Sequence, residues 1–356
     1  MREEAVMKKK MLLCTPIGEK RLAEIKEYCD VTIGGELKYG KGNVDSAQFK
    51  KDAEGYELVV LGDEVANGEM LRDWAASGMK FIGCAKGTPA TVDNATLMEL
   101  GIDLSYTPGR NAVTVAEFTI GLMLAVVRHI GCCFHDLRSG RYVGQPSENV
   151  YDVPDVKNVV WGPLDETHPA VHYGIGFELH GHTLGIAGFG AIGRKVAELA
   201  LAFGMTVLAY DPFVPAEVIE AAGCVPSTLD EMLSGSDIVS IHLPVLPETR
   251  ATVNKDWFSK MKPPAYLINT ARAAVIDQKD LVEALQNGTI HGAALDVYWQ
   301  EPIPANHPLL SMDHVLLTPH IAGMSTDVDG WSGELMAQEI LAYLKGEPRK
   351  YLWKRK

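Results

Sequence analysis

The stretch that most constrains the fold is residues 183–212, TLGIAGFGAIGRKVAELALAFGMTVLAYDP. An apolar run precedes Gly188, Gly190 and Gly193, which form the pattern G-x-G-x-x-G, and a helical pattern of apolar residues follows them. A second apolar run ends at Asp211, 18 residues past Gly193. The sequence therefore predicts a strand, a glycine turn, a helix and a second strand, in that order.

These residue types suit a dinucleotide. Gly188 permits the tight turn, Gly190 lets the backbone approach a pyrophosphate, and Gly193 lets the helix pack closely on the strand. The start of the helix offers free N–H groups and a positive dipole end to the phosphates. Asp211 can accept both ribose hydroxyls and would repel a 2′-phosphate, so we expect NAD rather than NADP. A purely structural turn would explain the glycines, but not the whole ordered set.

The composition limits the class of partner. The chain has 356 residues, with 33 basic and 46 acidic side chains and a formal net charge of −13, which argues against nucleic-acid binding and against a basic membrane-binding face. None of the six cysteines forms a C-x-x-C pair, so we expect reduced, mostly buried thiols in a cytoplasmic protein. The apolar run before Pro16 is too short for a secretion signal, and no run approaches a membrane span.

Apolar runs alternate with helical patterns on both sides of the glycine motif. The first part has predicted strands at 11–14, 31–33, 58–61, 81–84 and 102–106, with helices at 18–29, 46–54, 67–77 and 91–100. After Asp211, strands are predicted at 238–242, 266–269, 292–296 and 315–318, with helices near 215–222, 228–233, 255–260, 277–287 and 323–345. Such alternation predicts an α/β fold, with two Rossmann-like or flavodoxin-like parallel sheets covered by helices on both faces.

We therefore expect two domains. The first is discontinuous, residues 1–111 plus 323–356, and the second covers 112–322. One long helix over about 114–139 would act as a domain connector or as an oligomer contact. Its chain continues into an irregular insertion at about 140–180, which contains His168 and His172 four residues apart. No third ligand lies in register with them, so we predict a surface loop and no metal site.

Three polar residues follow predicted strands of the second domain. Arg272 lies in LINTARAAVID, Glu301 lies shortly after Asp296 in GAALDVYWQEP, and His320 lies in VLLTPHIAG. The carboxyl ends of parallel strands share one edge of a sheet, and that edge is where open α/β sheets bind ligands. Each residue alone has an ordinary structural explanation, but together they form a candidate catalytic set.

With these motifs the sequence resembles the D-isomer-specific 2-hydroxyacid dehydrogenase family, which includes phosphoglycerate, glycerate and D-lactate dehydrogenases. The resemblance covers nearly the whole chain and includes KFIGCAKGT…VDN at 80–94, the segment 101–128 and IHLPVLPET at 241–249. It implies hydride transfer between NAD(H) and a small D-2-hydroxy acid or 2-oxo acid. It also implies a cytoplasmic homodimer, in contact through the 114–139 region, with each active site in a cleft between two domains.

The resemblance assigns roles to individual residues. His320 would be the general acid/base, Glu301 would orient it, and Arg272 would anchor the substrate, a division that suits the chemistry of imidazole, carboxylate and guanidinium. The predicted cofactor-binding residues are Gly188, Gly190, Ala191, Ile192, Gly193, Asp211, His242, Pro244, Thr249, Thr270, Ala271, Arg272, Asp296 and His320. The predicted substrate-binding residues are Ala85, Lys86, Gly87, Arg272 and His320.

The first domain departs from the family pattern. Backbone N–H groups of Ala85 to Gly87 are expected to bind the substrate carboxylate, whereas Lys86 would either reach the substrate or face solvent. Asp63 and Glu64 stand where some phosphoglycerate enzymes have an arginine, and we expect them to disfavour a phosphorylated substrate there.

Two further alternatives concern function. Glu301 argues against a formate dehydrogenase, in which glutamine pairs with the histidine. C-terminal-binding co-repressors share the fold and the residue set, so an NAD-sensing binding protein with little turnover is the rival function. The insertion is expected to lie over an active-site mouth, either that of its own chain or that of its partner, with Trp161 or Tyr151 shaping the substrate pocket.

Overall fold

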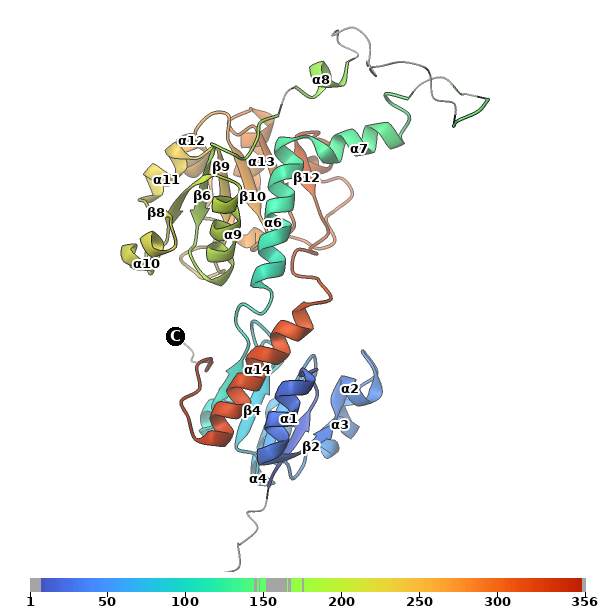
Figure 1. Cartoon of the computed structure of the whole chain (residues 1–356), viewed down its shortest axis with the longest axis vertical. Helices are drawn as coiled ribbons and strands as arrows, with labels where there is room; N and C mark the ends of the chain where they lie inside the picture. Colours follow the sequence, from blue (N-terminus) through green and yellow to red (C-terminus); the bar gives the residue numbers. More distant parts are fainter. Residues whose placement is uncertain are drawn as a thin grey trace, which may run out of the picture. The chain divides into compact units, whose positions relative to one another are not determined.

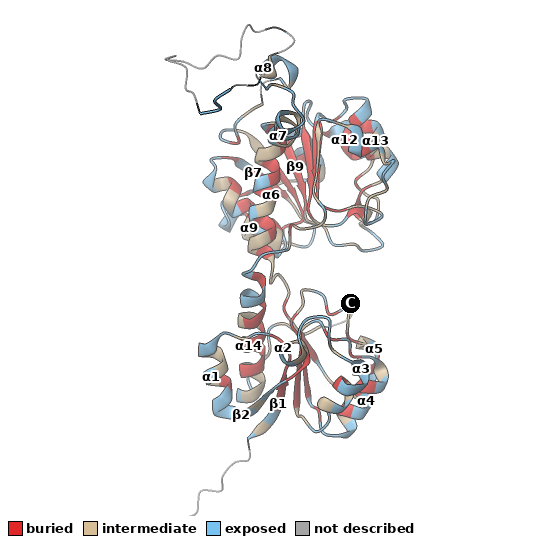
Figure 2. Ribbon diagram, turned by 90° about the vertical axis from the view of Figure 1, so that its right-hand side faces the viewer, coloured by how far each residue is buried: buried red, intermediate tan, exposed pale blue. Residues whose placement is uncertain are grey.

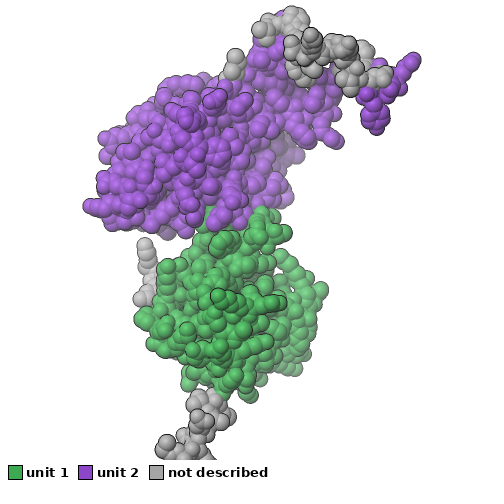
Figure 3. Space-filling model, viewed as in Figure 1, with its two compact units in different colours: residues 1–112, 323–356 green, residues 113–322 purple. Residues whose placement is uncertain are grey.

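The structure is a computed structural model that describes residues 8–143, 146, 148–151, 165, 168–174 and 176–353. The chain divides into two compact units, residues 1–112 with 323–356 (unit 1) and residues 113–322 (unit 2), which Figure 3 distinguishes by colour. Each unit is built around its own parallel sheet. Trp161 lies outside the described residues, and Tyr151 is described as an exposed side chain.

Unit 1 has a five-stranded sheet in the order β2-β1-β3-β4-β5, which is the flavodoxin-like order. Its strands are β1 Lys9–Leu13, β2 Cys29–Ile33, β3 Leu58–Leu61, β4 Phe81–Cys84 and β5 Leu104–Tyr106. Its helices are α1 Glu19–Tyr28, α2 Gly35–Tyr39, α3 Ser46–Asp52, α4 Gly68–Ala76, α5 Asn94–Leu100 and α14 Val328–Lys345. The sequence analysis did not predict α2, and it placed the start of the last helix at residue 323, five residues before α14 begins.

The two faces of this sheet carry separate cores. The central strands β3 and β4 are buried along their whole length. Helices cover both faces of the sheet, whose strands Figure 2 colours largely as buried. On one face the rings of Phe49 and Trp74 meet edge to face, with centroids 5.7 Å apart. On the other face Met336 and Ile340 of α14 pack around Phe81. These cores fix the loops at the carboxyl ends of β3 and β4.

Unit 2 has a seven-stranded parallel sheet in the order β12-β11-β10-β9-β6-β7-β8, which contains the Rossmann order. Its strands are β6 Thr183–Ala187, β7 Thr206–Tyr210, β8 Val225–Pro226, β9 Ile238–Ile241, β10 Tyr266–Asn269, β11 Gly292–Leu295 and β12 Val315–Leu317. Its α-helices are α6 Ala112–Val127, α7 Ile130–Arg138, α8 Pro169–His172, α9 Ala191–Ala202, α10 Ala216–Ala221, α11 Leu229–Gly235, α12 Lys255–Lys260 and α13 Gln278–Gln286, and 3₁₀ turns occupy Ala273–Val275 and Pro308–Ser311. The predicted strands are all present, and β8 is additional.

The prediction of one long helix over 114–139 was wrong. The segment forms two helices, α6 and α7, which Figure 1 shows turning away from each other after residue 127. The backbone of His129 is left-handed, with φ of 56°, and it ends the first helix. Neither glycine nor proline marks this break, so the apolar pattern gave no indication of it.

No single helix in the described ranges is long and apolar enough to cross a membrane; α6 and α7 reach that length only together, across a bend of 66°.

The order of strands in unit 2 sets the position of the glycine motif. Strand β6 lies between β9 and β7, so the direction of the connections reverses beside it, and the crevice at such a point is where α/β sheets bind ligands. The loops after β10, β11 and β12 leave the same edge of the sheet. The parallel register therefore brings the predicted catalytic loops to the edge that carries the glycine turn.

Two glycines of α14 provide a test of the packing in unit 1. An added Cβ at Gly333 would lie 2.3 Å from the carbonyl oxygen of Pro16, whereas a Cβ at Gly330 would meet nothing within 4 Å. We expect Gly333→Ala to lower the free energy of unfolding by about 1–3 kcal/mol through overpacking. Gly330→Ala should raise it by up to ~1 kcal/mol because alanine favours the helix. Urea unfolding of both variants tests this, and equal effects would contradict the packing described.

Candidate active site

The glycine turn after β6 has the geometry of a nucleotide cradle. Gly188 has φ of 97°, and a Cβ there would lie 2.7 Å from the carbonyl oxygen of His242. A Cβ at Gly193 would lie 2.1 Å from the Gly188 oxygen, so only glycine allows α9 to start this close to the strand. In front of Gly190 there is open space, and no side chain caps the start of α9. Within the described residues the N–H groups of Ala191 and Ile192 have no acceptor, so they are available to a pyrophosphate.

Asp211 stands beside this turn at the end of β7. Its Oδ2 accepts a hydrogen bond from the backbone N–H of Phe189 at 2.8 Å, and its Oδ1 accepts one from that of Phe213 at 2.9 Å. A carboxylate has about four acceptor positions, so two remain for ribose hydroxyls. The backbone bonds hold the carboxylate in place next to the glycine turn. The fit for NAD is therefore good at both the phosphate end and the ribose end.

His242 follows β9 on the other side of the turn. Its Nε2 bonds to the hydroxyl of Ser240 at 2.9 Å, while its Nδ1 is buried without a partner among the described residues. Burial lowers the pKa of His242 to about 4, so this imidazole is neutral at pH 7. Thr249 closes the loop that follows, because its hydroxyl donates to the carbonyl oxygen of Pro244 at 2.6 Å and accepts from the N–H of Leu246 at 2.8 Å.

The loop after β10 positions Arg272. Asn269 is 1% exposed; its amide oxygen accepts the Ala271 N–H at 3.0 Å, and its amide nitrogen donates to the Arg272 carbonyl oxygen at 3.0 Å. Thr270 turns its hydroxyl inward to Thr119 of α6, at 2.9 Å. The guanidinium of Arg272 is exposed and donates to the carbonyl oxygen of Ala271 at 2.6 Å. One buried amide thus shapes the loop and leaves the guanidinium available.

Asp296 fixes the loop after β12. The residue is 1% exposed, its Oδ1 accepts bonds from the Thr318 hydroxyl at 2.6 Å and the Ile321 N–H at 3.0 Å, and its Oδ2 accepts the Ala322 N–H at 2.8 Å. Of about four acceptor positions one remains for the cofactor contact that the sequence analysis predicted for it. Asp296 is therefore first of all a positioning residue for the loop that carries His320.

His320 and Glu301 are hydrogen-bonded to each other. The Nδ1 atom of His320 lies 2.7 Å from Oε2 of Glu301, whose other oxygen accepts the Tyr298 N–H at 3.0 Å. The bond to His320 lowers the pKa of Glu301, against a desolvation that raises it, so the carboxylate stays ionised. The backbone of His320 is left-handed, with φ of 56°, a conformation that is uncommon for a side chain of this size and typical of functional sites.

The three predicted catalytic residues line one cavity of about 500 Å³, which lies in the range of small-molecule sites. Its wall consists of Val245, Arg250, Ala251, Arg272, Ala273, Ala274, Ile276, Asp277, Gln278, Val297, Tyr298, Trp299, Glu301 and His320. All of these residues belong to unit 2. On one cavity wall, an imidazole backed by a carboxylate can deliver a proton to a carbonyl oxygen, and an exposed guanidinium can bind a neighbouring carboxylate.

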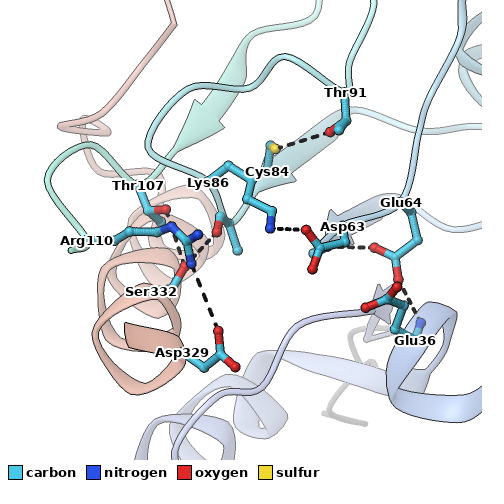
Figure 4. A network of polar contacts seen from close by, with 12 residues as sticks. Glu36, Asp63, Glu64, Cys84, Lys86, Thr91, Thr107, Arg110, Asp329 and Ser332 are labelled. Carbon is cyan, nitrogen blue, oxygen red and sulfur yellow. Dashed lines mark hydrogen bonds and ion pairs between the residues drawn. The ribbon is translucent and has the colours of Figure 1, made fainter. Parts of the chain in front are cut away.

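In the predicted substrate loop of unit 1, two of the three backbone N–H groups expected to bind the substrate already donate hydrogen bonds within the chain. The Ala85 N–H donates to the Leu61 carbonyl oxygen at 2.9 Å and the Lys86 N–H to the Cys84 carbonyl oxygen at 2.8 Å. Among the described residues, only the Gly87 N–H of this loop makes no bond. The ammonium group of Lys86 forms an ion pair with Asp63, as Figure 4 shows, so the side chain does not simply face solvent.

The two acidic side chains beside this loop also have partners within the chain. Asp63 is neutralised by Lys86, and Glu64, 5% exposed, accepts N–H bonds from Glu36 and Gly62 at 2.7 Å each (Figure 4). Burial raises the pKa of Glu64 above its ordinary value. Their repulsion of a phosphoryl group is therefore weaker than the sequence suggested.

The sequence analysis missed several residues of the site. Asn269, Tyr298 and Thr318 hold the predicted catalytic loops, and Arg250 and Trp299 line the cavity. Asn269 lies inside the quoted motif LINTARAAVID and could have been singled out as the buried polar residue at a strand end. Arg250 gave no signal, because an arginine in a polar loop has no periodicity or spacing to mark it.

The histidines of the insertion have structural partners. His168 caps α8 by accepting the Ala170 N–H at 3.1 Å, and the His172 ring bonds to Arg141 at 3.1 Å. Within the described ranges no group of three or more His, Cys, Asp or Glu side chains is placed to hold a metal ion. All six cysteines are free, and four of them, at 14, 29, 84 and 224, are buried.

The fold and the site define an NAD-linked oxidoreductase, and comparison with known proteins identifies the family. A sequence model described as "D-isomer specific 2-hydroxyacid dehydrogenase, NAD binding domain" matches residues 120–322. A glyoxylate reductase of Thermofilum pendens is 36% identical over 332 residues, which are 93% of this chain and 90% of the relative. The chain belongs to the D-isomer specific 2-hydroxyacid dehydrogenase family, whose cofactor is NAD.

Two further comparisons agree. A D-3-phosphoglycerate dehydrogenase of Methanocaldococcus jannaschii is 31% identical over 339 residues, which are 95% of this chain but 58% of that protein. The crystal structure of D-lactate dehydrogenase with NAD⁺ from Lactobacillus jensenii has the same fold, with a TM-score of 0.73 over 97% of this chain and all of that one, at 24% identity. These relatives support an enzyme and not the NAD-sensing co-repressor-like alternative.

The buried imidazole of His242 gives a prediction on pH. Its pKa of about 4 in the folded chain lies below the ordinary value of about 6.5, so between these pH values the unfolded chain binds the extra proton. Stability should therefore fall as pH is lowered from 7 to 4, with about 3 kcal/mol of the loss due to this residue. His242→Asn should flatten the pH dependence of urea unfolding. His135→Asn, which removes an exposed histidine, is the control, and an unchanged slope in His242→Asn would refute the assignment.

Proposed function

We propose that this enzyme reduces a small 2-oxo acid to the D-2-hydroxy acid with NADH, through His320, Glu301 and Arg272. The observation that carries the proposal is the 2.7 Å bond between His320 and Glu301 on the wall of the cavity that Arg272 also lines. NAD(H), when bound, supplies or accepts the hydride, and the chain must bind, orient and protonate the substrate.

His320 is the proton donor in this proposal. Its Nδ1 is held by Glu301, so Nε2 is the nitrogen left to give a proton to the carbonyl oxygen of the substrate. The ionised carboxylate stabilises the imidazolium from which the proton leaves, and it fixes the direction in which the ring points. In the reverse direction the same nitrogen takes the hydroxyl proton.

Arg272 anchors the substrate. A guanidinium can bind a carboxylate with two parallel hydrogen bonds, and it can also polarise the neighbouring carbonyl group. We propose that Ala85, Lys86 and Gly87 of unit 1 complete the substrate site, with the free N–H of Gly87 as the main donor. The relatives named above act on glyoxylate and 3-phosphoglycerate, so we expect the substrate of this enzyme to be a small 2-oxo acid.

The cofactor site is proposed on the glycine turn. Gly188, Gly190, Ala191, Ile192 and Gly193 would bind the pyrophosphate, with Asp211 on the adenosine ribose. The remaining proposed contacts come from the loops at the same edge of the sheet: His242, Pro244, Thr249, Thr270, Ala271, Arg272, Asp296 and His320. For Thr270, whose hydroxyl is bonded to Thr119, the backbone is the available group.

The test is a panel of 2-oxo acids, such as glyoxylate, pyruvate and hydroxypyruvate, with NADH oxidation followed by absorbance. We expect turnover with at least one of them, and His320→Ala should lower kcat by about 10²–10⁴-fold while NADH still binds. Glu301→Gln keeps the shape but not the charge, so its loss should be smaller and should be greatest on the alkaline side. Full activity of His320→Ala, or no turnover by the wild-type enzyme, would overturn the proposal.

We further propose that the enzyme is a homodimer. Helix α7 exposes Ile130, Phe134 and Leu137, which are 53%, 65% and 49% accessible and follow one another at helical spacing. A contiguous apolar stripe on one helix is typical of a contact surface, and a second copy of the chain is the partner that the family resemblance implies.

The six free thiols accord with a reducing compartment, and we propose a cytoplasmic location on that basis.

The stripe on α7 predicts how the dimer can be broken. We expect Phe134→Glu to convert it to a monomer, because the substitution places a charge in an apolar contact. Light scattering after size-exclusion chromatography measures the mass. Met98→Glu, which alters a similarly exposed side chain (64%) on α5 of unit 1, should leave the dimer intact. A wild-type monomer, or a dimer that survives Phe134→Glu, would contradict the proposal.

A further inference from the structure

The catalytic cavity contains a second arginine that the mechanism does not use. Arg250 lines the same cavity as Arg272, Glu301 and His320. The residue is exposed, and its guanidinium makes no hydrogen bond or ion pair with any residue in the described part of the chain. An unpaired guanidinium on the wall of a small-molecule site is available to a ligand, whereas most arginines near acids form pairs.

The loop that carries Arg250 is fixed to the loop that carries Arg272. The Ala251 N–H donates to the Ala274 carbonyl oxygen at 3.0 Å, and the Val253 N–H donates to that of Val275, also at 3.0 Å. The Arg250 N–H itself bonds back to Leu246 at 3.0 Å. The backbone of Ala251 is left-handed, with φ of 54°, a conformation that alanine rarely adopts without a constraint from its surroundings. The loops that carry the two arginines are therefore fixed to each other through their backbones.

Arg250 is the basic residue of this cavity wall whose side chain has no hydrogen-bonded or ionic partner in the described part of the chain. The basic residues of the cavity are Arg250, Arg272 and His320, and its acids are Asp277 and Glu301. Glu301 is paired with His320, and Asp277 caps α13 by accepting the Asp280 N–H at 3.0 Å. One carboxylate on the substrate satisfies Arg272. Arg250 then still has no carboxylate beside it when a simple monocarboxylate occupies the site.

We propose that Arg250 binds a second carboxylate at the far end of the substrate, so that the preferred substrate class is 2-oxo dicarboxylic acids. The inference rests on the proposed function and specifies its substrate. One guanidinium matches one carboxylate with two parallel hydrogen bonds. A phosphoryl group carries up to two charges, and with Asp277 and Glu301 on the same wall it would meet more repulsion than a carboxylate does.

The experiment compares matched pairs of substrates. Oxaloacetate and 2-oxobutyrate share a four-carbon skeleton, and 2-oxoglutarate and 2-oxovalerate share a five-carbon skeleton, so each pair differs by a carboxylate in place of a methyl group. We expect kcat/KM with NADH to favour the dicarboxylate of at least one pair. Arg250→Gln should lower the ratio of the two kcat/KM values, dicarboxylate over its methyl counterpart, by about 10–100-fold. The change should come mainly from the KM of the dicarboxylate, as expected for the loss of a charge-assisted pair. Arg250→Lys should restore part of it.

Lys279→Gln is the control, because it removes one positive charge from a side chain of α13 that is 84% exposed and lies outside the cavity wall. Its ratio should equal that of the wild-type enzyme. An equal change for both members of each pair in Arg250→Gln would overturn the inference and leave the proposed function standing. A change confined to the KM of NADH would also overturn it, as would a preference for a phosphorylated 2-oxo acid that Arg250→Gln abolishes. No turnover with any 2-oxo acid would remove the proposed function and the inference together.

Discussion

The candidate active-site edge of unit 2 depends on one buried carboxylate. Asp296 leaves the end of β11 and accepts three hydrogen bonds from the loop after β12, at the Thr318 hydroxyl and at the N–H groups of Ile321 and Ala322. A carboxylate removed from water is costly unless its acceptor positions are filled, so the loop and the carboxylate determine each other's conformation. His320 lies between the bonded positions and can hold its left-handed backbone because its neighbours are fixed.

The same logic extends to the partners of His320. Tyr298 donates its hydroxyl to the Thr318 carbonyl oxygen at 2.8 Å, and its N–H holds one oxygen of Glu301. Asn269 performs a comparable task for the Arg272 loop with its amide group. The proposed reacting side chains are exposed, whereas Asn269, Asp296 and Tyr298, which hold their loops, are buried or half-buried and hydrogen-bonded. This division gives a site that is accessible to a ligand and still rigid.

Much of this arrangement could be predicted from the sequence, because local patterns and parallel topology determine it. The glycine turn, Asp211 and the loops of Arg272, Glu301 and His320 are recognisable since each requires a particular residue type at a strand end. What could not be predicted depends on tertiary contacts. The break at His129 has no sequence signal, and the pairing of Lys86 with Asp63 joins residues 23 apart in the chain. The same holds for Arg250, whose importance arises only from the cavity it lines.

The edges of the seven-stranded sheet have a consequence for how copies of this protein can associate. One edge strand, β8, has two residues and ends in Pro226, which lacks the N–H that a neighbouring strand would need. The other, β12, has three. Neither edge offers a long row of free backbone groups, so the sheet is a poor template for strand addition, and this limits cross-β aggregation. Self-association is thereby directed to side-chain surfaces on helices.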